Sequence, residues 1–321
     1  MFEQLFSEHG LSLDRLHTSQ EVAEAGSIAA AARGDATRQS QYSRQLKELE
    51  QFFGITLTRR QGRVLTLTPA GQELLQIVNA SFCALDDFKC RASASMYRYM
   101  LGCGDSIHAW MVAPVLGQAV QEGQPWQFSF ANLRNADVSR QLLDMELDLG
   151  ILRTSAISSD VLDSVPVARV KYALYVPGHL QRAGLSFAQA VTTLPIATLG
   201  SGSFYTRLQE VLQAEGLKMA NMNATQSFPF ALRLLRTGGY AAFLPDIAEV
   251  ELPEDVLKLE SPALDSLSRK LSLAWNPRLL RVRPAAEEVI RFFIQMLTRR
   301  GAFVLPFLCA CANLGAWISV S

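Results

Sequence analysis

The sequence has no net charge, because 30 Lys and Arg residues balance 30 Asp and Glu residues over 321 positions. This balance excludes a uniformly cationic protein that coats nucleic acid through bulk charge, so a DNA contact requires a local basic patch. The five cysteines are odd in number and irregularly spaced, which argues against a disulfide framework. Only four histidines are present and none has the spacing of a zinc site, so we expect no metal and no cofactor.

Charged residues make up only 19% of the chain, but 49% of the residues are apolar, which is typical of a folded protein and not of a disordered one. The length suggests two or three domains. The N-terminus lacks a basic segment followed by an apolar one, so we expect no signal peptide and no membrane partner. The expected location is the cytoplasm.

The last segment, residues 301–321, contains no charge at all. A membrane anchor would need about 20 apolar residues, but Pro306, Asn313 and Gly315 dilute the segment. A buried terminal helix is a second interpretation, and a shifted reading frame with no selected role is a third. We favour the last two, between which the sequence does not decide.

Positive charge is concentrated near the N-terminus: residues 1–32 carry a net charge of −4, and residues 33–63 carry +4. In the second stretch, apolar residues from Tyr42 to Phe53 recur at spacings of four, three and four, which predicts an amphipathic helix. Arginine and glutamine side chains lie off this stripe. The basic stretch therefore predicts an exposed, donor-rich helix face.

The residues around this helix predict its ends and its neighbours. Ser27 is suited to cap a short preceding helix, Thr37 to cap the basic helix and Gly54 to end it. Helix, tight turn and helix, with donors near the start of the second, is the layout of a helix-turn-helix. Residues 57–67 then place a glycine turn between short extended pieces with arginines at the tip. We interpret this segment as a wing that touches phosphates.

A further helix begins at Thr68-Pro69, since proline is favoured at the first helical position. Its apolar residues have the heptad-like spacing of three, four and three that suits pairing with a second copy. Packing inside one chain is the alternative, but the preceding domain is too small to cover this stripe. We therefore predict a dimerisation seam made of Leu75, Val78, Phe82 and Leu85.

Beyond residue 100, short apolar runs alternate with amphipathic segments, which is typical of α/β units around mostly parallel sheets. We predict strands within residues 100–103, 128–131, 147–152, 172–176, 195–199, 241–244 and 271–275.

One set of residues between positions 26 and 71 has a specific order and spacing: Gly26-Ser27, Ala31-Ala32, Gln39, Ser43-Arg44-Gln45-Leu46, Leu49-Glu50, Gly54, Leu57, Arg59-Arg60 and Leu67-Thr68-Pro69-Ala70-Gly71. This set resembles the DNA-binding domain of LysR-type transcriptional regulators. Weaker similarity continues at Leu147-Asp148-Leu149-Gly150-Ile151 and from Gly238 to Pro245, which resemble parts of the effector domain of that family. Together the matches cover roughly residues 10–298.

The sequence departs from the family pattern at the turn, the basic helix and the wing. Asp35 stands where the family usually has leucine, Thr58 replaces a phenylalanine, and residues 38–42 replace the usual Ser-Gln-Pro-Ala-Val. The apolar stripe is intact, so the scaffold is expected to be conserved in form. An inherited base preference is not expected, because the changed positions lie at the tip that would enter the groove.

The resemblance implies an α/β chain with an N-terminal winged helix-turn-helix, a linker helix and a two-lobed effector domain like a periplasmic binding protein. We place these parts at residues 1–68, 69–93 and 94–298, followed by the apolar tail, 299–321. The first lobe would comprise residues 100–173 and 271–298, and the second residues 174–270. The family dimerises through the linker helix and often assembles into tetramers, so we expect a homodimer or a homotetramer.

The implied function is sequence-specific binding of double-stranded DNA, switched by a small anionic effector, with a carboxylate-bearing metabolite as our hypothesis. Arg and Gln suit the edges of guanine and adenine, and basic wing residues suit phosphates. The candidate DNA contacts are Arg38, Gln39, Ser40, Gln41, Ser43, Arg44, Lys47, Arg59, Arg60 and Arg63. The candidate effector contacts, by position in the family and by chemistry, are Ser106, Asn135, Arg153, Ser201 and Ser203.

No nucleophile elbow, metalloprotease motif, P-loop or dinucleotide fingerprint is present in the sequence, so we expect no enzymatic activity and no catalytic residue. The serines among the effector candidates could instead merely cap helices. The competing interpretation of the whole chain is an enzyme or small-molecule binder whose N-terminal domain serves only for dimerisation. Binding to a preferred DNA sequence distinguishes the two.

Overall fold

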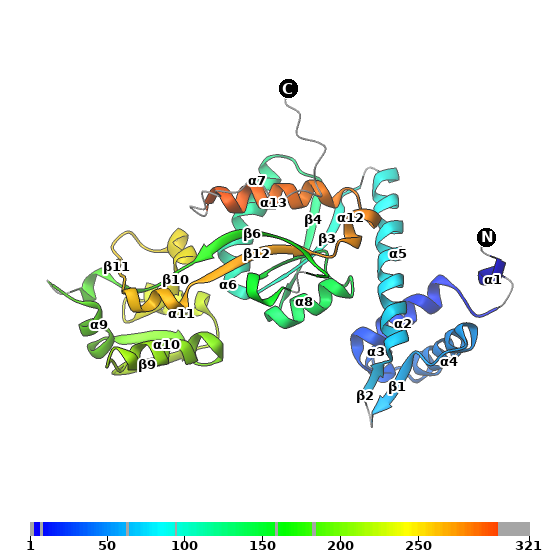
Figure 1. The fold of residues 1–321 in the computed structure, drawn as a ribbon, viewed down its shortest axis with the longest axis horizontal. Coiled ribbons are helices and arrows are strands. Elements are labelled where there is room, and N and C mark those ends of the chain that lie inside the picture. Colours follow the sequence, from blue (N-terminus) through cyan, green and yellow to red (C-terminus); the bar gives the residue numbers. More distant parts are fainter. Residues whose placement is uncertain are drawn as a thin grey trace.

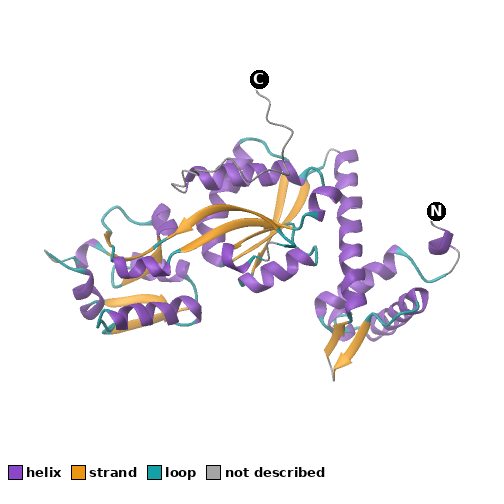
Figure 2. Ribbon diagram, viewed as in Figure 1, coloured by secondary structure: helices purple, strands orange, loops and turns teal. Residues whose placement is uncertain are grey.

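The structure is a computed structural model that describes residues 3–6, 9–61, 64–93, 95–157, 160–181 and 184–300. The predictions for the apolar tail and for Arg63 lie outside these residues. Figures 1 and 2 show the parts in chain order: a small helical domain with a two-stranded sheet, the long helix α5, and two α/β lobes. An N-terminal helix-turn-helix domain followed by a mixed α/β domain confirms the predicted fold class.

The N-terminal domain packs its helices around one apolar stripe. Its elements are α1 (Glu3–Phe6), α2 (Leu13–Ala25), α3 (Ile28–Ala31), α4 (Ala36–Phe53), β1 (Thr58–Gln61) and β2 (Val64–Leu67). Tyr42, Leu46 and Leu49 of α4 are at most 5% exposed, as their helical spacing predicts. The stripe turns the opposite, charged face of α4 toward solvent.

The ends of these helices follow the expected chemistry with one exception. The Ser27 hydroxyl accepts a hydrogen bond from the Ala30 amide at 3.1 Å, and Gly54 ends α4 with a φ of 65°, so both predictions are confirmed. The prediction of Thr37 as the cap of α4 is wrong. Asp35 caps the helix instead, and its Oδ1 accepts hydrogen bonds from the amides of Thr37 and Arg38 at 2.8 and 3.1 Å.

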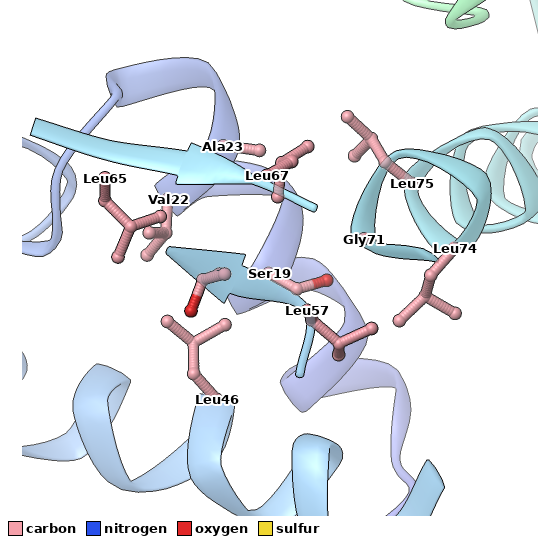
Figure 3. A pocket seen from close by; sticks show the side chains of 11 residues that line it. Ser19, Val22, Ala23, Leu46, Leu57, Leu65, Leu67, Gly71, Leu74 and Leu75 are labelled. Carbon is pink, nitrogen blue, oxygen red and sulfur yellow. The ribbon is translucent and has the colours of Figure 1, made fainter. Parts of the chain in front are cut away.

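Helix α5 (Pro69–Ser93) begins directly against the N-terminal domain. Gly71 makes this possible, because a Cβ at that position would lie 2.1 Å from the carbonyl oxygen of Leu57. Figure 3 shows the contact, where Leu67, Leu75 and Val22 face one another around a cavity of about 10 Å³. So small and apolar a space is a packing gap and not a ligand site.

The two lobes each contain a five-stranded sheet. Lobe 1 is built from β3 (Tyr97–Cys103), α6 (Asp105–Ile107), the π-helical turn η1 (His108–Val112), α7 (Ala113–Gln121), β4 (Trp126–Asn132), α8 (Asn135–Leu143), β5 (Leu149–Arg153), η2 (Thr154–Ala156), β6 (Asp163–Val170), β12 (Arg269–Trp275), α12 (Arg278–Val282) and α13 (Ala286–Arg300). Lobe 2 is built from β7 (Tyr172–Val176), η3 (Gly178–Leu180), α9 (Phe187–Thr193), β8 (Pro195–Leu199), α10 (Gly202–Ala214), β9 (Asn221–Thr225), α11 (Phe228–Arg236), β10 (Ala241–Pro245), η4 (Asp246–Glu251), β11 (Leu257–Leu259) and η5 (Pro262–Leu267).

The sheets are mixed, not mostly parallel as predicted. The strand order is β4-β3-β5-β12-β6 in lobe 1 and β11-β7-β10-β8-β9 in lobe 2. In lobe 1, β12 pairs antiparallel with both β5 and β6. The reason is the double crossing: β6 leads the chain out to lobe 2 and β12 brings it back. These two strands lie side by side between the lobes (Figure 1).

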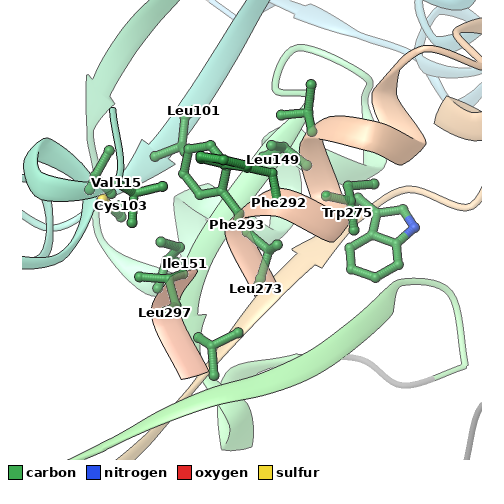
Figure 4. Close-up of a cluster of buried hydrophobic side chains, with 14 of the residues drawn as sticks. Leu101, Cys103, Val115, Leu149, Ile151, Leu273, Trp275, Phe292, Phe293 and Leu297 are labelled. Atoms are coloured by element: carbon green, nitrogen blue, oxygen red, sulfur yellow. The ribbon is translucent and has the colours of Figure 1, made fainter. Parts of the chain in front are cut away.

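Each lobe has its own apolar core. In lobe 1, α13 covers the sheet, and Figure 4 shows Phe293 and Leu297 packed against Leu149, Ile151 and Leu273. Cys103 is fully buried in this cluster, as expected for a small apolar residue, and burial raises the pKa of its thiol. In lobe 2, a separate cluster surrounds β7, β8 and β10. Trp110, from the η1 turn of lobe 1, belongs to this second cluster, so the lobes share apolar contact near the crossings.

A buried ion-pair network fastens α5 to lobe 1. The guanidinium of Arg283 lies 2.8 Å from Asp148 Oδ1 and 3.8 Å from Asp87 Oδ1, and it donates to the carbonyl of Arg98 at 2.6 Å. Its Cζ stands 4.6 Å from the ring centroid of Tyr99. Asp87 of α5 is fully buried, so this contact is shielded from solvent. We call Asp87, Arg283 and Asp148 the Arg283 network.

A second set of polar contacts lies about two to four turns earlier on α5. The side-chain amide of Gln72 donates to both carboxylate oxygens of Asp144 at 3.0 Å, and Asn79 donates to the carbonyl of the same residue at 2.8 Å. Asp144 follows α8 of lobe 1. The N-terminal part of α5 therefore contacts both the N-terminal domain and lobe 1.

Replacement of Arg283 by methionine is expected to lower the free energy of unfolding by about 3–5 kcal/mol, because the buried carboxylate of Asp148 loses its counter-charge and Asp87 keeps only its pair with Arg91 on the same helix. Urea unfolding followed by the fluorescence of Trp126 and Trp275, which lie in the core of lobe 1, measures the change. Arg281→Met, an exposed residue on α12, the short helix that ends just before Arg283, is the matched control and should change stability by no more than about 0.5 kcal/mol. Equal urea midpoints for the two variants would contradict the role of the network.

Candidate DNA-binding and effector sites

The candidate DNA-reading residues on α4 are spread around the helix, off its apolar stripe. Gln39 and Ser43 are half-buried, and the others are exposed: Arg38, Ser40, Gln41, Arg44 and Lys47. This mixture of half-buried and exposed side chains follows from the apolar stripe, because residues three or four positions apart share a face of the helix. The N-terminal half of α4 thus presents several donors to solvent without burying any charge.

Internal contacts orient part of this face. Arg38 Nη2 donates to the Tyr42 hydroxyl at 3.2 Å, and Tyr42 in turn donates to Glu21 Oε2 at 2.5 Å. This bond to Glu21 is the main reason that the pKa of Tyr42 lies above its usual value. Since the guanidinium of Arg38 also lies 5.7 Å from the Tyr42 ring centroid, its position is set by α2 as well as α4.

Farther along α4, Glu48 balances two cations. It accepts from Arg15 at 2.6 Å and from Arg44 at 2.8 Å, and these bonds, Arg15 first, hold the pKa of its carboxyl below the usual range. Arg44 remains 82% exposed despite this pair. An exposed ion pair of this kind is weak, so Arg44 is free to exchange Glu48 for a phosphate.

The wing is present as β1 and β2, which pair antiparallel. Arg59 is exposed and faces Thr66 across the pair; the side chain of Arg60 lies outside the described part of the structure. The structure explains Thr58, one of the departures from the family pattern. Its hydroxyl and amide, together with the amide of Leu57, donate to Glu50 Oε1 at 2.8–3.2 Å. Polar contacts therefore tie the start of the wing to α4.

Three of the five candidate effector residues are joined directly. The Asn135 side-chain oxygen accepts a hydrogen bond from the Arg153 amide at 3.0 Å, and Arg153 Nη2 donates to the Ser203 hydroxyl at 3.2 Å. The second bond crosses from β5 of lobe 1 to α10 of lobe 2. Ser201 is the exposed N-cap of α10 and makes no side-chain capping bond. Ser106 is half-buried on α6, and no hydrogen bond among the described residues links it to the other four.

Two arginines that sequence reasoning missed lie beside these residues. Arg207 follows Ser203 by one helical turn on α10, and Arg269 begins β12 two residues before Leu271, the residue that pairs with Arg153. The i to i+4 spacing from Ser203 was a usable signal for Arg207. Arg269 had no such signal, because only the register of β12 on β5 brings it to this position.

The dimerisation candidates divide between the inside and the surface of the chain. Leu75 and Val78 are only 4% and 1% exposed within one chain, so α5 uses them for contacts inside that chain. Phe82 is half-buried, and Leu85 is 54% exposed. Ile77 and Phe88, which were not predicted, are 53% and 64% exposed.

The described residues contain no cluster of three or more His, Cys, Asp or Glu residues arranged to hold a metal ion. Within the same residues, no helix is both long enough and apolar enough to cross a membrane.

Known families match both parts of the chain. The model for the bacterial regulatory helix-turn-helix protein, lysR family, matches residues 13–72, and the LysR substrate binding domain matches residues 95–298. The chain belongs to the LysR family. This LysR-type protein is accordingly a DNA-binding transcriptional regulator with an effector-binding domain, in a family of regulators and not of enzymes.

Individual relatives agree with this assignment. A protein described as a probable nitrogen assimilation transcriptional activator of Synechococcus elongatus is 27% identical over 296 residues, which cover 89% of this chain and 94% of the relative. A full-length OxyR variant from Pseudomonas aeruginosa shares the fold with a TM-score of 0.62 at 17% identity, over 93% of this chain and all of that one. Full-length CbnR in complex with its target DNA gives a TM-score of 0.53 at 18% identity, over 88% and 100% of the chains.

Proposed function

We propose that this LysR-type regulator recognises a specific DNA sequence with the N-terminal half of α4 and is switched by an anionic effector bound between its lobes. The observation that carries the proposal is the Arg153–Ser203 hydrogen bond, which joins the two lobes through a cation at the position of a predicted effector contact. A regulator of bacterial DNA acts in the cytoplasm. The competing proposal, an N-terminal domain used only for dimerisation, gives no reason for the exposed donors of α4.

We assign base recognition to the start of α4, and phosphate contact to the other end of α4 and to the wing. Arg38 and Gln41 lie near the start of α4, the end that a recognition helix inserts into the major groove, and their donors match the edges of guanine and adenine. Lys47, near the other end, and Arg59, on the wing, are exposed cations suited to phosphates. This division predicts different phenotypes for the two groups.

Gln41→Ala is expected to cost about 1–3 kcal/mol at the cognate site and to relax base preference there, because a base-edge contact is lost. Arg59→Ala should weaken binding about equally on all sequences and reduce the salt dependence, because a phosphate contact is lost. Selection of bound sequences from a genomic library measures the base preference. Binding of the selected sequences at increasing salt concentration measures the salt dependence. Altered base preference in Arg59→Ala but not in Gln41→Ala would reverse the assignment, and selection of no preferred sequence would favour the competing proposal.

Dimerisation is assigned to the exposed stripe of α5. Ile77, Leu85 and Phe88 fall within an arc of roughly 80° on the helix, since successive residues are about 100° apart. All three are more than half exposed in the single chain, although large apolar side chains favour burial. We define these residues as the α5 stripe. A second copy of α5 laid against this stripe would bury it and give the two-fold arrangement that paired half-sites require.

Leu85→Asp and Phe88→Asp should each abolish pairing through α5, because either change places a charge in the apolar contact. Neither residue is buried in the protomer, so both variants should keep the wild-type circular dichroism spectrum. Sedimentation velocity should then show a particle of half the wild-type mass. Val250→Asp, an equally exposed apolar site on lobe 2, serves as the control. If both α5 variants kept the wild-type mass, the stripe would not be the dimer contact.

Effector binding is assigned to the junction of the lobes. Ser201 and Ser203 begin α10, a helix of 13 residues whose first amides and dipole favour a negative charge. Arg153 reaches the same turn from lobe 1 and can grip a carboxylate with two parallel hydrogen bonds. An anion placed between them would contact both lobes and change the strength with which they hold together.

Organic acids should raise the melting temperature of the wild type, since a ligand at a hundredfold excess over its Kd stabilises the native state by about 2.7 kcal/mol. The same acids should have little effect on Arg153→Ala, and their uncharged amides should have little effect on either protein. Arg169→Ala, an exposed arginine on β6, which β12 separates from β5, controls for the loss of one positive charge. Stabilisation by uncharged compounds only, or equal stabilisation of Arg153→Ala by the acids, would refute the anionic site.

A further inference from the structure

Three guanidinium groups, not one, converge at the junction between the lobes. Arg153 and Arg269 come from neighbouring strands of lobe 1. Leu271 lies directly opposite Arg153 in the antiparallel pair of β12 and β5, and Arg269 precedes it by two residues. Residues opposite one another, or two apart on one strand, share a face of the sheet. Arg153 and Arg269 are therefore side by side at the same end of that face.

The third guanidinium, that of Arg207, comes from lobe 2. Arg207 lies one turn after Ser203, which accepts the hydrogen bond from Arg153. The guanidinium of Arg207 reaches the segment before β12, where its Nη2 donates to the carbonyl of Ser266 at 2.8 Å. Arg269 Nη1 donates to the carbonyl of Ser268, two residues farther on, at 3.2 Å. Hydrogen bonds and strand register thus link all three arginines through both lobes.

The charge of this group is not balanced by the described part of the chain. None of the ion pairs among the described residues includes Arg153, Arg207 or Arg269. Nε of Arg269 is buried without a hydrogen-bond partner among those residues. The pKa of Arg269 lies below its usual value, first because of burial and then because Arg153 and Arg207 repel a further positive charge.

Asp246 is an acid near this region: its charge raises the pKa of the Tyr172 hydroxyl, whereas the charges of Arg269 and Arg153 lower it. Burial raises the pKa of Asp246 and so favours its uncharged form. Even when ionised, it balances only one of three cations. Tyr172 packs against Phe204 and Phe228 with ring centroids 4.6 and 5.8 Å away, so an apolar, aromatic surface adjoins the arginines. Such a surface strengthens the attraction between a cation and an anion that displaces water.

We propose that the effector of this regulator carries two anionic groups, and that Arg207 and Arg269 bind one of them while Arg153 and the N-terminus of α10 bind the other. This inference rests on the proposed effector site and specifies its ligand. A monoanion would leave two of the three guanidinium charges without a partner, whereas a dianion leaves one. Dicarboxylates and phosphorylated carboxylates share the required chemistry. Arg207 and Arg269 are thus specificity-determining residues for ligand charge.

The test compares acids that carry two anionic groups with partners that carry one. The carboxylate arm uses succinate with its monoamide and phthalate with its monoamide, which differ by one charge at nearly constant size; the phosphate arm uses 3-phosphoglycerate with glycerate, which differ by the phosphoryl group. Titration calorimetry on the full chain at constant ionic strength measures each Kd, so that general screening does not differ within a pair. The proteins are wild type, Arg207→Gln, Arg269→Gln and Arg169→Gln. The last residue pairs with Lys270 and therefore lies on the opposite face of the sheet from Arg269.

Wild type and Arg169→Gln are expected to bind the acid with two anionic groups in at least one pair tenfold or more tightly than its partner with one. In Arg207→Gln and Arg269→Gln this preference should fall to about twofold or less, with the affinity for the monoanion nearly unchanged. The arm in which the preference appears identifies the second group as carboxylate or phosphate. Circular dichroism confirms that all four proteins are folded.

Two kinds of failure are distinguishable. Equal binding of dianions and monoanions by the wild type, or a preference that survives both Arg207→Gln and Arg269→Gln, overturns the dianion proposal but leaves the anionic site at Arg153 in place. Absence of binding of every acid to the wild type overturns both the dianion proposal and the proposed effector site.

Discussion

The buried guanidinium of Arg283 fixes the geometry on which both functional sites depend. It lies between Asp87 of α5 and Asp148 of lobe 1, in surroundings where a charge without a partner costs several kcal/mol. A buried ion pair is a poor source of stability, because desolvation offsets most of the attraction, but it strongly penalises any arrangement that separates the partners. We infer that the network specifies how α5 meets the effector domain. The N-terminal end of the same helix is set against the DNA-binding domain at Gly71.

Helix α5 consequently has residues in three different environments. Leu75 and Val78 are buried within the chain, Asp87 faces Arg283, and the α5 stripe remains exposed. In the proposed dimer, the stripe sets the distance between two copies of α4, while the buried faces connect each α4 to its effector domain. In the proposed effector site, a ligand between the lobes would act on Arg153, on β5, the strand next to β3 and β12. Asp148 immediately precedes β5, so the proposed effector site and the Arg283 network are at opposite ends of one strand.

Local patterns in the sequence were sufficient for much of the fold. The stripe from Tyr42 to Phe53, the cap at Ser27 and the glycine at Gly54 depend on residues within a few positions of one another, and all were predicted correctly. The cap at Thr37 was assigned wrongly because the helix begins earlier, at Ala36, so the first amides without an intrahelical partner include those of Thr37 and Arg38, which the carboxylate of Asp35 accepts. The strands β6, β9 and β11 were missed, because they are polar or short and lack a continuous apolar run.

Features that depend on distant pairing could not be predicted. Asp148 was part of a recognised motif, yet its partner Arg283 lies 135 positions away, so no local signal connects them. Arg269 joins Arg153 only through the register of β12 on β5, which the sequence does not specify. The spacing of Leu75 and Val78 was correctly helical, but helical spacing does not tell whether a neighbouring domain or a second chain covers the stripe. Asn135 and Arg153 were selected by resemblance to the family and Ser203 by its expected place at a helix N-terminus, and hydrogen bonds link the three in the structure.

A double-mutant cycle between α5 and lobe 1 tests the central claim most directly. The free energy of unfolding is measured for Asp87→Asn, Arg283→Met and the double variant, with tryptophan fluorescence as the signal. If Asp87 and Arg283 form one buried network across the two parts, the double variant should lose at least 1 kcal/mol less than the sum of the single losses. Losses that add within about 0.3–0.5 kcal/mol would show that the two residues act independently and would contradict the account.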